Sequence, residues 1–314
     1  MKDSEKNLAE SIRHRLRNRF KESGEDISFG LQRYASERFL YRLGESSHRD
    51  RFILKGAALF AIWGSSVYRP TRDLDFTGYG SSEISDIIEV FRDLCAMPDV
   101  GDGLSFDRDS VSAEPIRDEA EYHGLRVRFR ALLGESKILM QVDIGFGNAV
   151  EPAPVEIQYP SLLDHPGPRI RAYPLEAVIA EKLHAMVVLG ERNSRFKDFY
   201  DLYVFARQFP FKGEDLSRAI AATFNRRGTA IDAALPAAIS PRFFAADARA
   251  KQWRAYLSRN SLPGAPADFI AAGESLQAFL VPLWRALGDN RKFSDFWPPL
   301  GPWTVSKASE DPNI

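Results

Sequence analysis

The sequence predicts an α+β protein with a small sheet in its first half and a mainly helical second half. Three observations predict this: an apolar run of strand length over residues 52–54, two β-rich runs over residues 125–133 and 137–146, and an Ala-rich, helix-patterned segment from residue 213 to about residue 287. With 314 residues, 44% of them hydrophobic, the chain can bury a sizeable core. We expect two domains, residues 1–160 and residues 161–314.

The elements around the first strand follow from apolar spacing. Helices are expected over residues 7–20, 28–43, 83–97 and 175–189. Lys55-Gly56 ends the first strand and opens an apolar, helix-compatible run over residues 57–63. Residues 98–109, with two glycines, are expected to form a loop, and Gly134-Glu135-Ser136 is expected to turn between the two β-rich runs.

Two carboxylates stand at i and i+2 in Asp73-Leu74-Asp75. On a strand they share one face, while Leu74 and Phe76 point to the other. Carboxylates held this close repel each other unless a cation lies between them. Mg²⁺ fits such a place because it prefers oxygen ligands and is usually held by one or two carboxylates together with substrate phosphates.

A third acid lies on a later strand. In the run KILMQVDIGF, over residues 137–146, Asp143 is framed by Val142 and Ile144. An unpaired carboxylate in apolar surroundings is costly, so its presence indicates a partner or a function. Three acids on two strands suit a two-metal site for phosphoryl or nucleotidyl transfer.

The preceding strand carries one basic face. Arg126, Arg128 and Arg130 alternate with Val127 and Phe129. This face either meets the acids around the cleft or is solvated, and we favour the solvated interpretation.

Five segments occur in an order that resembles one known family: LKGAALF, RPTRDLDF, VDIGFG, PLEAVIAEKLHAM and RFKDFYDLYVF. They are similar to the AbiEii/AbiGii toxin family of nucleotidyltransferases, a branch of the polymerase-β-type superfamily. The resemblance spans roughly residues 29–209, about 180 of the 314 residues. The chain departs from the family where Gly56-Ala57 replaces the usual Gly-Gly. The resemblance implies a polymerase-β-like core, a small mixed sheet flanked by helices, followed by a mainly helical C-terminal lobe.

The resemblance also implies roles for residues of the site. Asp73, Asp75 and Asp143 form the metal triad for Mg²⁺, with Mn²⁺ as the alternative ion, and an NTP is the substrate. Lys182 meets the nucleotide phosphates and is counted with the catalytic residues. Asp198 is counted with them too: it caps the helix that follows, orients Lys182, or does both.

The nucleotide-binding residues are expected in the turns beside the acids. Gly56 lies where a strand meets a helix, so backbone N–H groups there can face phosphate oxygens. Arg69 and Thr71 match the family wording R-x-[ST]-x-D-h-D. The full expected set is Lys55, Gly56, Ser66, Arg69, Thr71 and Lys182.

Charge is distributed unevenly in a chain whose net charge is −1. Residues 207–260 contain ten basic residues and four acids, which suits an RNA partner. Trp253 or Tyr256 either stacks on a nucleotide there or belongs to the core. There is one cysteine, the five histidines lack zinc-ligand spacing, and no apolar run is long enough to cross a membrane, so we expect a cytoplasmic protein without a zinc site.

The leading functional hypothesis is a Mg²⁺-dependent enzyme that transfers NMP from an NTP to an acceptor hydroxyl and releases pyrophosphate. The resemblance implies that the acceptor is RNA, namely the 3′ end of tRNA, and that the protein is a toxin restrained by a separate antitoxin. Two alternatives stay open. One is a protein nucleotidylyltransferase that modifies Ser, Thr or Tyr, and the other is a nucleotide-binding regulator without turnover.

Overall fold

The chain divides into two compact units, each described by itself below. The computed structural model describes residues 2–63, 71–116, 124–147, 150–260, 262 and 264–305. The first unit comprises Met1–Gly64, Pro70–Asn148 and Pro154–Tyr173, and the second comprises Ser65–Arg69, Ala149–Ala153 and Pro174–Ile314. The domain boundary expected after residue 160 therefore falls inside the first unit, because strand β7 (Arg169–Ala172) pairs there with strand β1 (Phe52–Lys55).

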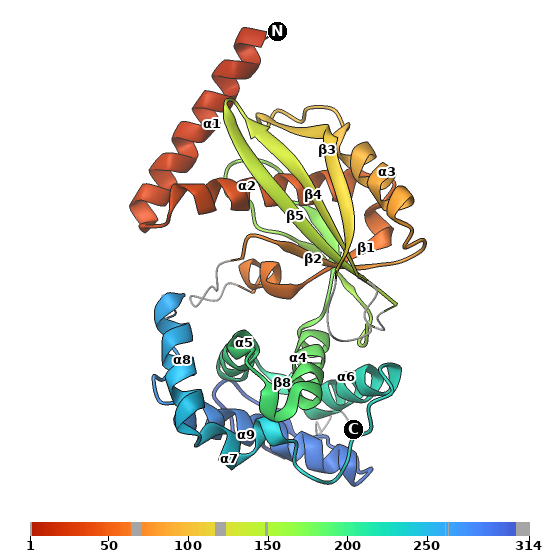
Figure 1. Ribbon diagram of the computed structural model, residues 1–314, viewed down its shortest axis with the longest axis vertical. Helices are drawn as coiled ribbons and strands as arrows, with labels where there is room; N and C mark the ends of the chain where they lie inside the picture. The colour runs from red at the N-terminus through yellow and green to blue at the C-terminus, as the bar shows by residue number, and fades with distance from the viewer. Residues whose placement is uncertain are drawn as a thin grey trace, which may run out of the picture. The chain divides into compact units, whose positions relative to one another are not determined.

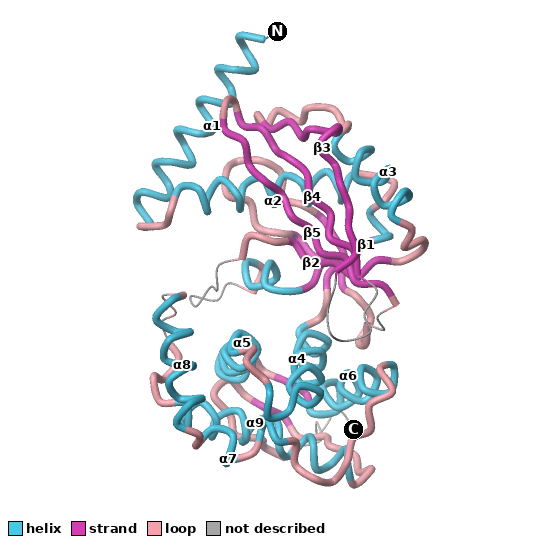
Figure 2. The backbone as a smooth tube through the Cα atoms, viewed as in Figure 1, coloured by secondary structure: helices cyan, strands magenta, loops and turns pink. Residues whose placement is uncertain are grey.

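A mixed sheet forms the centre of the first unit (Figures 1 and 2). Its strand order is β3-β4-β5-β2-β1-β7-β6. The remaining strands are β2 (Leu74–Gly78), β3 (Leu104–Ile116), β4 (Gly124–Leu133), β5 (Ser136–Phe146) and β6 (Val155–Gln158). The pairs β2–β5 and β1–β7 are parallel, and the other neighbours are antiparallel. The predicted α+β class and the mixed sheet are confirmed.

The hairpin β4–β5 forms as the sequence predicts, with apolar residues alternating toward the core. Strand β3 differs from prediction, because residues 104–109 were expected to be loop. This strand is polar on its exposed side and its register with β4 shifts between Asp107 and Ser112. Edge strands commonly carry such charges and irregularities, which hide the alternation that marks a strand.

Three long helices of the first unit are α1 (Lys2–Ser23), α2 (Ile27–Glu45) and α3 (Ile84–Cys95). The Asp26 side chain caps α2 by accepting a hydrogen bond from the Phe29 N–H, 3.0 Å away. Phe39, Phe91 and Phe129 pack against one another beneath the sheet, with ring centroids 4.9–5.9 Å apart. The helix-compatible run after Gly56 is a short 3₁₀ helix, η2 (Gly56–Ala61). A second one, η1 (Arg49–Arg51), precedes β1.

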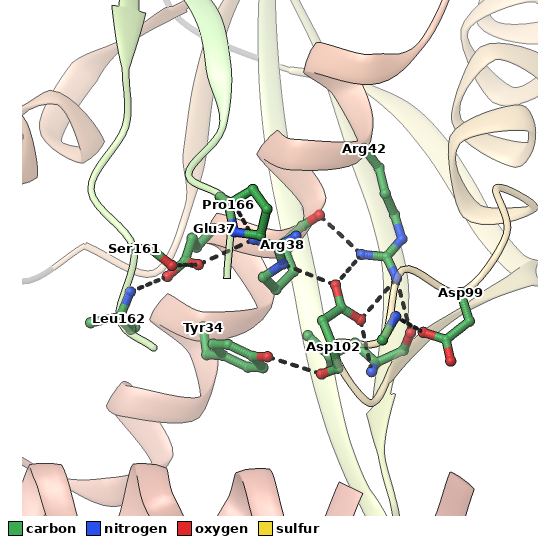
Figure 3. Close-up of polar contacts among 11 residues, drawn as sticks. Tyr34, Glu37, Arg38, Arg42, Asp99, Asp102, Ser161, Leu162 and Pro166 are labelled. Atoms are coloured by element: carbon green, nitrogen blue, oxygen red, sulfur yellow. Dashed lines mark hydrogen bonds and ion pairs between the residues drawn. The ribbon is translucent and has the colours of Figure 1, made fainter. Parts of the chain in front are cut away.

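A buried ionic cluster fixes α2 to the rest of the unit (Figure 3). Asp102, fully buried, receives hydrogen bonds from Arg42 (2.7 and 3.1 Å) and Arg38 (2.9 Å). Burial by itself would raise the pKa of Asp102, but the two guanidinium groups lower it overall. Glu37, also on α2, accepts hydrogen bonds from Ser161 and from the Leu162 N–H. The cluster therefore joins α2 to the turn before β3 and to the segment between β6 and β7.

The second unit is mainly helical, as predicted (Figure 2). Its elements are α4 (Leu175–Leu189), η3 (Gly190–Arg192), α5 (Phe196–Gln208), β8 (Phe211–Lys212), α6 (Gly213–Arg226), η4 (Ala237–Ile239), α7 (Pro241–Phe244), α8 (Asp247–Arg259), α9 (Phe269–Gly288) and β9 (Phe296–Trp297). Aromatic rings on α5, α7, α8 and α9 pack around Phe269. No helix in the described part of the chain is both long and apolar enough to cross a membrane.

Trp253 belongs to this aromatic core. Its side chain is completely buried, its ring centroid lies 5.2 Å from that of Phe269, and its Nε1–H donates to the Pro266 carbonyl at 2.8 Å. The sequence left open whether Trp253 stacks on a nucleotide or packs in the core, and the structure supports the core.

Candidate active site

One row of charged residues crosses five strands of the sheet. Asp75 on β2 is in register with Lys55 on β1 and with Asp143 on β5, and Asp143 is in register with Arg126 on β4. Glu114 on β3 continues the row opposite Arg126. Side chains that are directly opposite on neighbouring strands lie on the same face, about 5 Å apart at Cβ. The register therefore brings two of the three predicted acids together.

Asp73 lies one residue before β2 and two before Asp75. Residues two apart in an extended chain share a face, so Asp73 continues the acidic side of the strand. Leu74 and Phe76 are buried on the other side, as their spacing predicts. Thr71 supports this entry into the strand, because its hydroxyl donates to the Asp73 carbonyl at 3.2 Å.

Asp143 forms a bidentate ion pair with Arg126. Arg126 Nε donates to Asp143 Oδ1 at 2.8 Å, and Arg126 Nη2 donates to Oδ2 at 2.7 Å. The hydrogen bonds from Asp143 raise the pKa of Arg126 above its usual value, and the charge of Asp73 adds to this. For Arg126 the solvated interpretation is therefore wrong, because its guanidinium meets the acids.

The other two arginines of β4 pair with acids of β3 instead. Arg128 Nη1 lies 2.6 Å from Glu114 Oε1, and Arg130 Nη2 lies 2.6 Å from Asp107 Oδ2. Both pairs are more exposed than Arg126–Asp143. Arg126 is thus the member of the arginine face that lies beside the metal triad expected from the sequence.

Gly56 passes directly against Asp75. A Cβ atom at this position would lie 2.2 Å from Asp75 Oδ2, and the φ angle of Gly56 is +74°. Both facts require glycine, the first for space and the second for backbone conformation. The predicted turn at the strand–helix junction therefore lies beside the carboxylate. Lys55, on its N-terminal side, places its ammonium 5.8 Å from the Tyr173 ring centroid.

Replacing Gly56 with alanine is expected to destabilise the first unit and to impair the nucleotide transfer that the motifs imply. A left-handed alanine costs about 1–2 kcal/mol, and the new methyl group would also displace the Asp75 carboxylate. Thermal melting and an NTP-transfer assay would measure the two effects. The matched control is Gly24→Ala, since Gly24 has φ +71° but nothing within 4 Å of the added Cβ. Equal losses of activity in both variants would contradict a special role for the approach to Asp75.

A second cluster lies in the second unit, between helices α4 and α5. Lys182 Nζ lies 2.9 Å from Asp198 Oδ1 and 2.7 Å from Asp201 Oδ2, and Arg195 Nε donates to Asp198 Oδ2 at 2.7 Å. Both aspartates are buried. Burial alone would raise the pKa of Asp198, but the charges of Lys182 and Arg195 prevail and lower it to about 2.

This geometry decides between the two roles expected for Asp198. The N-cap of α5 is Arg195, which makes no capping hydrogen bond with its side chain, and Asp198 lies inside the first turn. Asp198 therefore orients Lys182 and does not cap the helix. The sequence missed that Arg195 and Asp201 join the same cluster. Their i, i+3, i+6 spacing with Asp198 places all three on one side of α5 and could have revealed it.

Two predicted nucleotide-binding residues, Ser66 and Arg69, lie outside the described residues. For the others, a role in nucleotide binding stays a prediction.

The donor chemistry of Asp73, Asp75 and Asp143 fits a hard divalent cation, because all three offer carboxylate oxygens. Within the described residues, no three or more His, Cys, Asp or Glu side chains are grouped so that they could hold a metal ion. Both oxygens of Asp143 accept hydrogen bonds from Arg126.

Comparison with known proteins identifies the class of protein and its family. A family described as "Nucleotidyl transferase AbiEii toxin, Type IV TA system" matches residues 38–280, well over half of the chain. The protein is thus a nucleotidyltransferase. It belongs to the AbiEii toxin family, which confirms the resemblance found in the motifs and implies a nucleotide substrate and an antitoxin partner.

Solved structures with some likeness include two bacterial proteins. MenT4, a nucleotidyltransferase toxin from Mycobacterium tuberculosis H37Rv, is 18% identical with a TM-score of 0.45, over 85% of this chain and 94% of that one. JHP933 from Helicobacter pylori is 14% identical with a TM-score of 0.42, over 81% of this chain and 90% of that one. No curated protein matches the sequence. The family assignment rests on the match over residues 38–280.

Proposed function

We propose that this protein is a Mg²⁺-dependent toxin that transfers NMP from an NTP to a hydroxyl at the 3′ end of tRNA. The observation that carries the proposal is the placement of Asp75 and Asp143 side by side on the parallel strands β2 and β5, with Asp73 two residues away. In the reaction, the acceptor oxygen bonds to the α-phosphorus while the bond to the β-phosphate bridging oxygen breaks. Pyrophosphate leaves, and the hydroxyl proton passes to solvent.

The site residues expected from the sequence would take the following parts in this reaction. Asp73 and Asp75 would hold the cation that accompanies the triphosphate, and Asp75 and Asp143 would hold a second. Bound magnesium would neutralise phosphate charge and lower the pKa of the acceptor hydroxyl. Lys182, oriented by Asp198 and Asp201, would supply a point charge to the phosphates.

The basic surface expected to bind RNA needs revision. Within residues 207–260, Arg227 contacts Glu181 and His184, and Arg249 donates to the carbonyls of Asn193 and Glu191, so both stabilise the fold. The exposed basic residues that remain in this sector are Arg207, Lys212, Arg218, Arg226, Arg242, Lys251, Arg254 and Arg259. They provide one candidate surface for the acceptor.

Helix α1 provides a second one, in the same unit as the carboxylates. Its exposed basic residues are Arg13, Arg15, Arg17, Arg19 and Lys21, together with His14. Arg13, Arg17 and Lys21 recur every four residues, about 6 Å apart along the helix. The C-terminal end of α1 contacts α2, because the Phe20 side chain packs on Gly30. Two residues further along α2, Gln32 donates to the carbonyl of Arg72, which is next to Asp73 in the chain. This continuity supports α1 as the surface that guides RNA to the acids.

Charge reversal distinguishes the two surfaces. The triple variant Arg13→Glu/Arg17→Glu/Lys21→Glu is expected to weaken tRNA binding and to reduce the magnitude of its salt slope by about three, since each lost phosphate contact removes about one unit. The matched variant Arg226→Glu/Lys251→Glu/Arg254→Glu tests the second unit. NTP-analogue binding should survive in both.

The acceptor itself is identified by incubating wild type with labelled NTP, Mg²⁺ and total tRNA. Label on RNA supports the proposal. Label on protein, with none on RNA, would favour the alternative of a protein nucleotidylyltransferase. Unchanged RNA binding in both triple variants would place the acceptor on neither surface.

A further inference from the structure

We infer that Arg126 is an internal counter-cation that holds Asp143 until metal and nucleotide arrive, and that it links their binding. The inference rests on the proposed function, because it assigns a part to a residue beside the proposed metal triad. Arg126 lies outside the five family segments noted in the sequence, and its own spacing marked it only as one of three alternating arginines.

The contact between Arg126 and Asp143 is fixed by the backbone. The two residues are directly opposite in the antiparallel pair β4–β5, where Cβ atoms lie about 5 Å apart. Two guanidinium donors each reach one carboxylate oxygen, Nε to Oδ1 at 2.8 Å and Nη2 to Oδ2 at 2.7 Å. Bidentate pairs between arginine and a carboxylate are among the stronger hydrogen-bonded contacts in proteins. A cation that takes Asp143 as a ligand would share these oxygens with Arg126 and would be repelled by its positive charge.

Arg126 also interacts electrostatically with a neighbouring acid. The charge of Asp73 stabilises the protonated guanidinium in addition to Asp143 itself. The guanidinium thus occupies the same field of negative charge that the proposed cation would occupy. Two cations compete for one set of carboxylates, so each lowers the affinity of the site for the other.

A displaced Arg126 would need a new anion. Glu114, opposite Arg126 on β3, is already paired with Arg128 at 2.6 Å. The triphosphate that accompanies the metal offers oxygens suited to the planar fork of the guanidinium. Arg126 would then move from Asp143 to phosphate, so that metal favours nucleotide binding and nucleotide favours metal binding by the same factor.

The test uses the full chain and two matched variants. In Arg126→Gln, Mn²⁺ measured without nucleotide by calorimetry is expected to bind about tenfold more tightly than in wild type, within the range usual for coupled sites. Arg128→Gln, on the same face two residues away, should bind Mn²⁺ as wild type does. Arg126→Lys keeps the positive charge beside Asp143 and should stay near wild type, which separates charge from packing.

The nucleotide half of the inference is tested with a non-hydrolysable NTP analogue. At saturating Mn²⁺, Arg126→Gln is expected to bind the analogue about tenfold more weakly, and without metal the two proteins should differ little. An Mn²⁺ affinity in Arg126→Gln that equals or falls below that of wild type would overturn the competition. Equal analogue affinity at saturating Mn²⁺ would overturn the link.

These outcomes are distinct from failure of the proposed function. If wild type binds Mn²⁺ and analogue with the expected linkage but labels no acceptor, the linkage stands and the proposed transfer fails. If wild type binds no Mn²⁺, the inference about Arg126 fails with it.

Discussion

Replacing Asp75 with asparagine is expected to lower the rate of nucleotide transfer by roughly a thousandfold. Asp75 lies in register between Lys55 and Asp143, so it is the acid that both proposed cations would share. Asparagine keeps the shape of the side chain and removes its charge. Because this side chain is partly exposed, the melting temperature should change little. A time course of label transfer from NTP, run beside a thermal melt, measures both quantities.

The control for this variant is another acid of the same unit. Asp86 is exposed on α3, and Asp86→Asn should leave both transfer and melting near wild type. Near-normal transfer by Asp75→Asn would rule out metal-held catalysis at β2.

Replacing Lys182 with alanine is expected to lower the free energy of unfolding by about 3–5 kcal/mol. The lysine lies between Asp198 and Asp201, whose side chains are almost completely buried. Its removal takes a positive charge from between two buried carboxylates, while Arg195 stays paired with Asp198. Chemical denaturation at neutral pH measures the loss.

A double variant separates structure from catalysis. Lys182→Ala/Asp201→Asn also removes the negative charge of Asp201 and should recover much of the stability. Transfer should stay low if Lys182 contacts the nucleotide, and should return if the lysine only holds the fold. A melting temperature of Lys182→Ala equal to that of wild type would contradict the structural role.

The pH dependence of the free energy of unfolding provides a second test of the same cluster. In the folded protein the pKa of Asp198 is about 2, below its ordinary value of 3.8, because Lys182 and Arg195 outweigh the effect of burial. A lowered folded-state pKa contributes stability that is present above pH 3.8 and is lost as the pH falls toward 2. Wild type should lose stability over that interval, and Asp198→Asn should lack this part of the pH dependence.

The carboxylates could be predicted from sequence because their pattern is local. Two acids at i and i+2 with apolar neighbours between them already define a strand with an acidic face. The sequence left open whether the arginine face meets the acids, because the register that decides it depends on the length of the turn. The structure has Leu133 opposite Ser136, a two-residue turn, which sets Arg126 opposite Asp143. The three-residue turn expected from sequence shifts the register by one and points Arg126 away from Asp143.

Other features depend on contacts distant in sequence. The parallel pairing of β1 with β7 joins Leu54 to Ala172, and no local pattern predicts it. The role of Trp253 follows from the rings that surround it, which include Phe196 of α5 and Phe269 of α9. The ion pair between Lys182 and Asp201 was easier to predict from sequence, because it required only that the face of α5 carrying Asp198 be identified.

The ionic cluster around Asp102 also sets a limit on how far the protein can be shortened. The region that matches the AbiEii family begins at residue 38, inside α2. A fragment starting there would lack the Asp26 cap, and it would lose the hydrogen bonds that Tyr34 makes to the Asp102 carbonyl and that Glu37 receives from Leu162. Arg38 would become a chain end while still facing a buried carboxylate. A fragment that begins at residue 38 is therefore expected to be less stable than one that keeps the whole of α2 and its Asp26 cap.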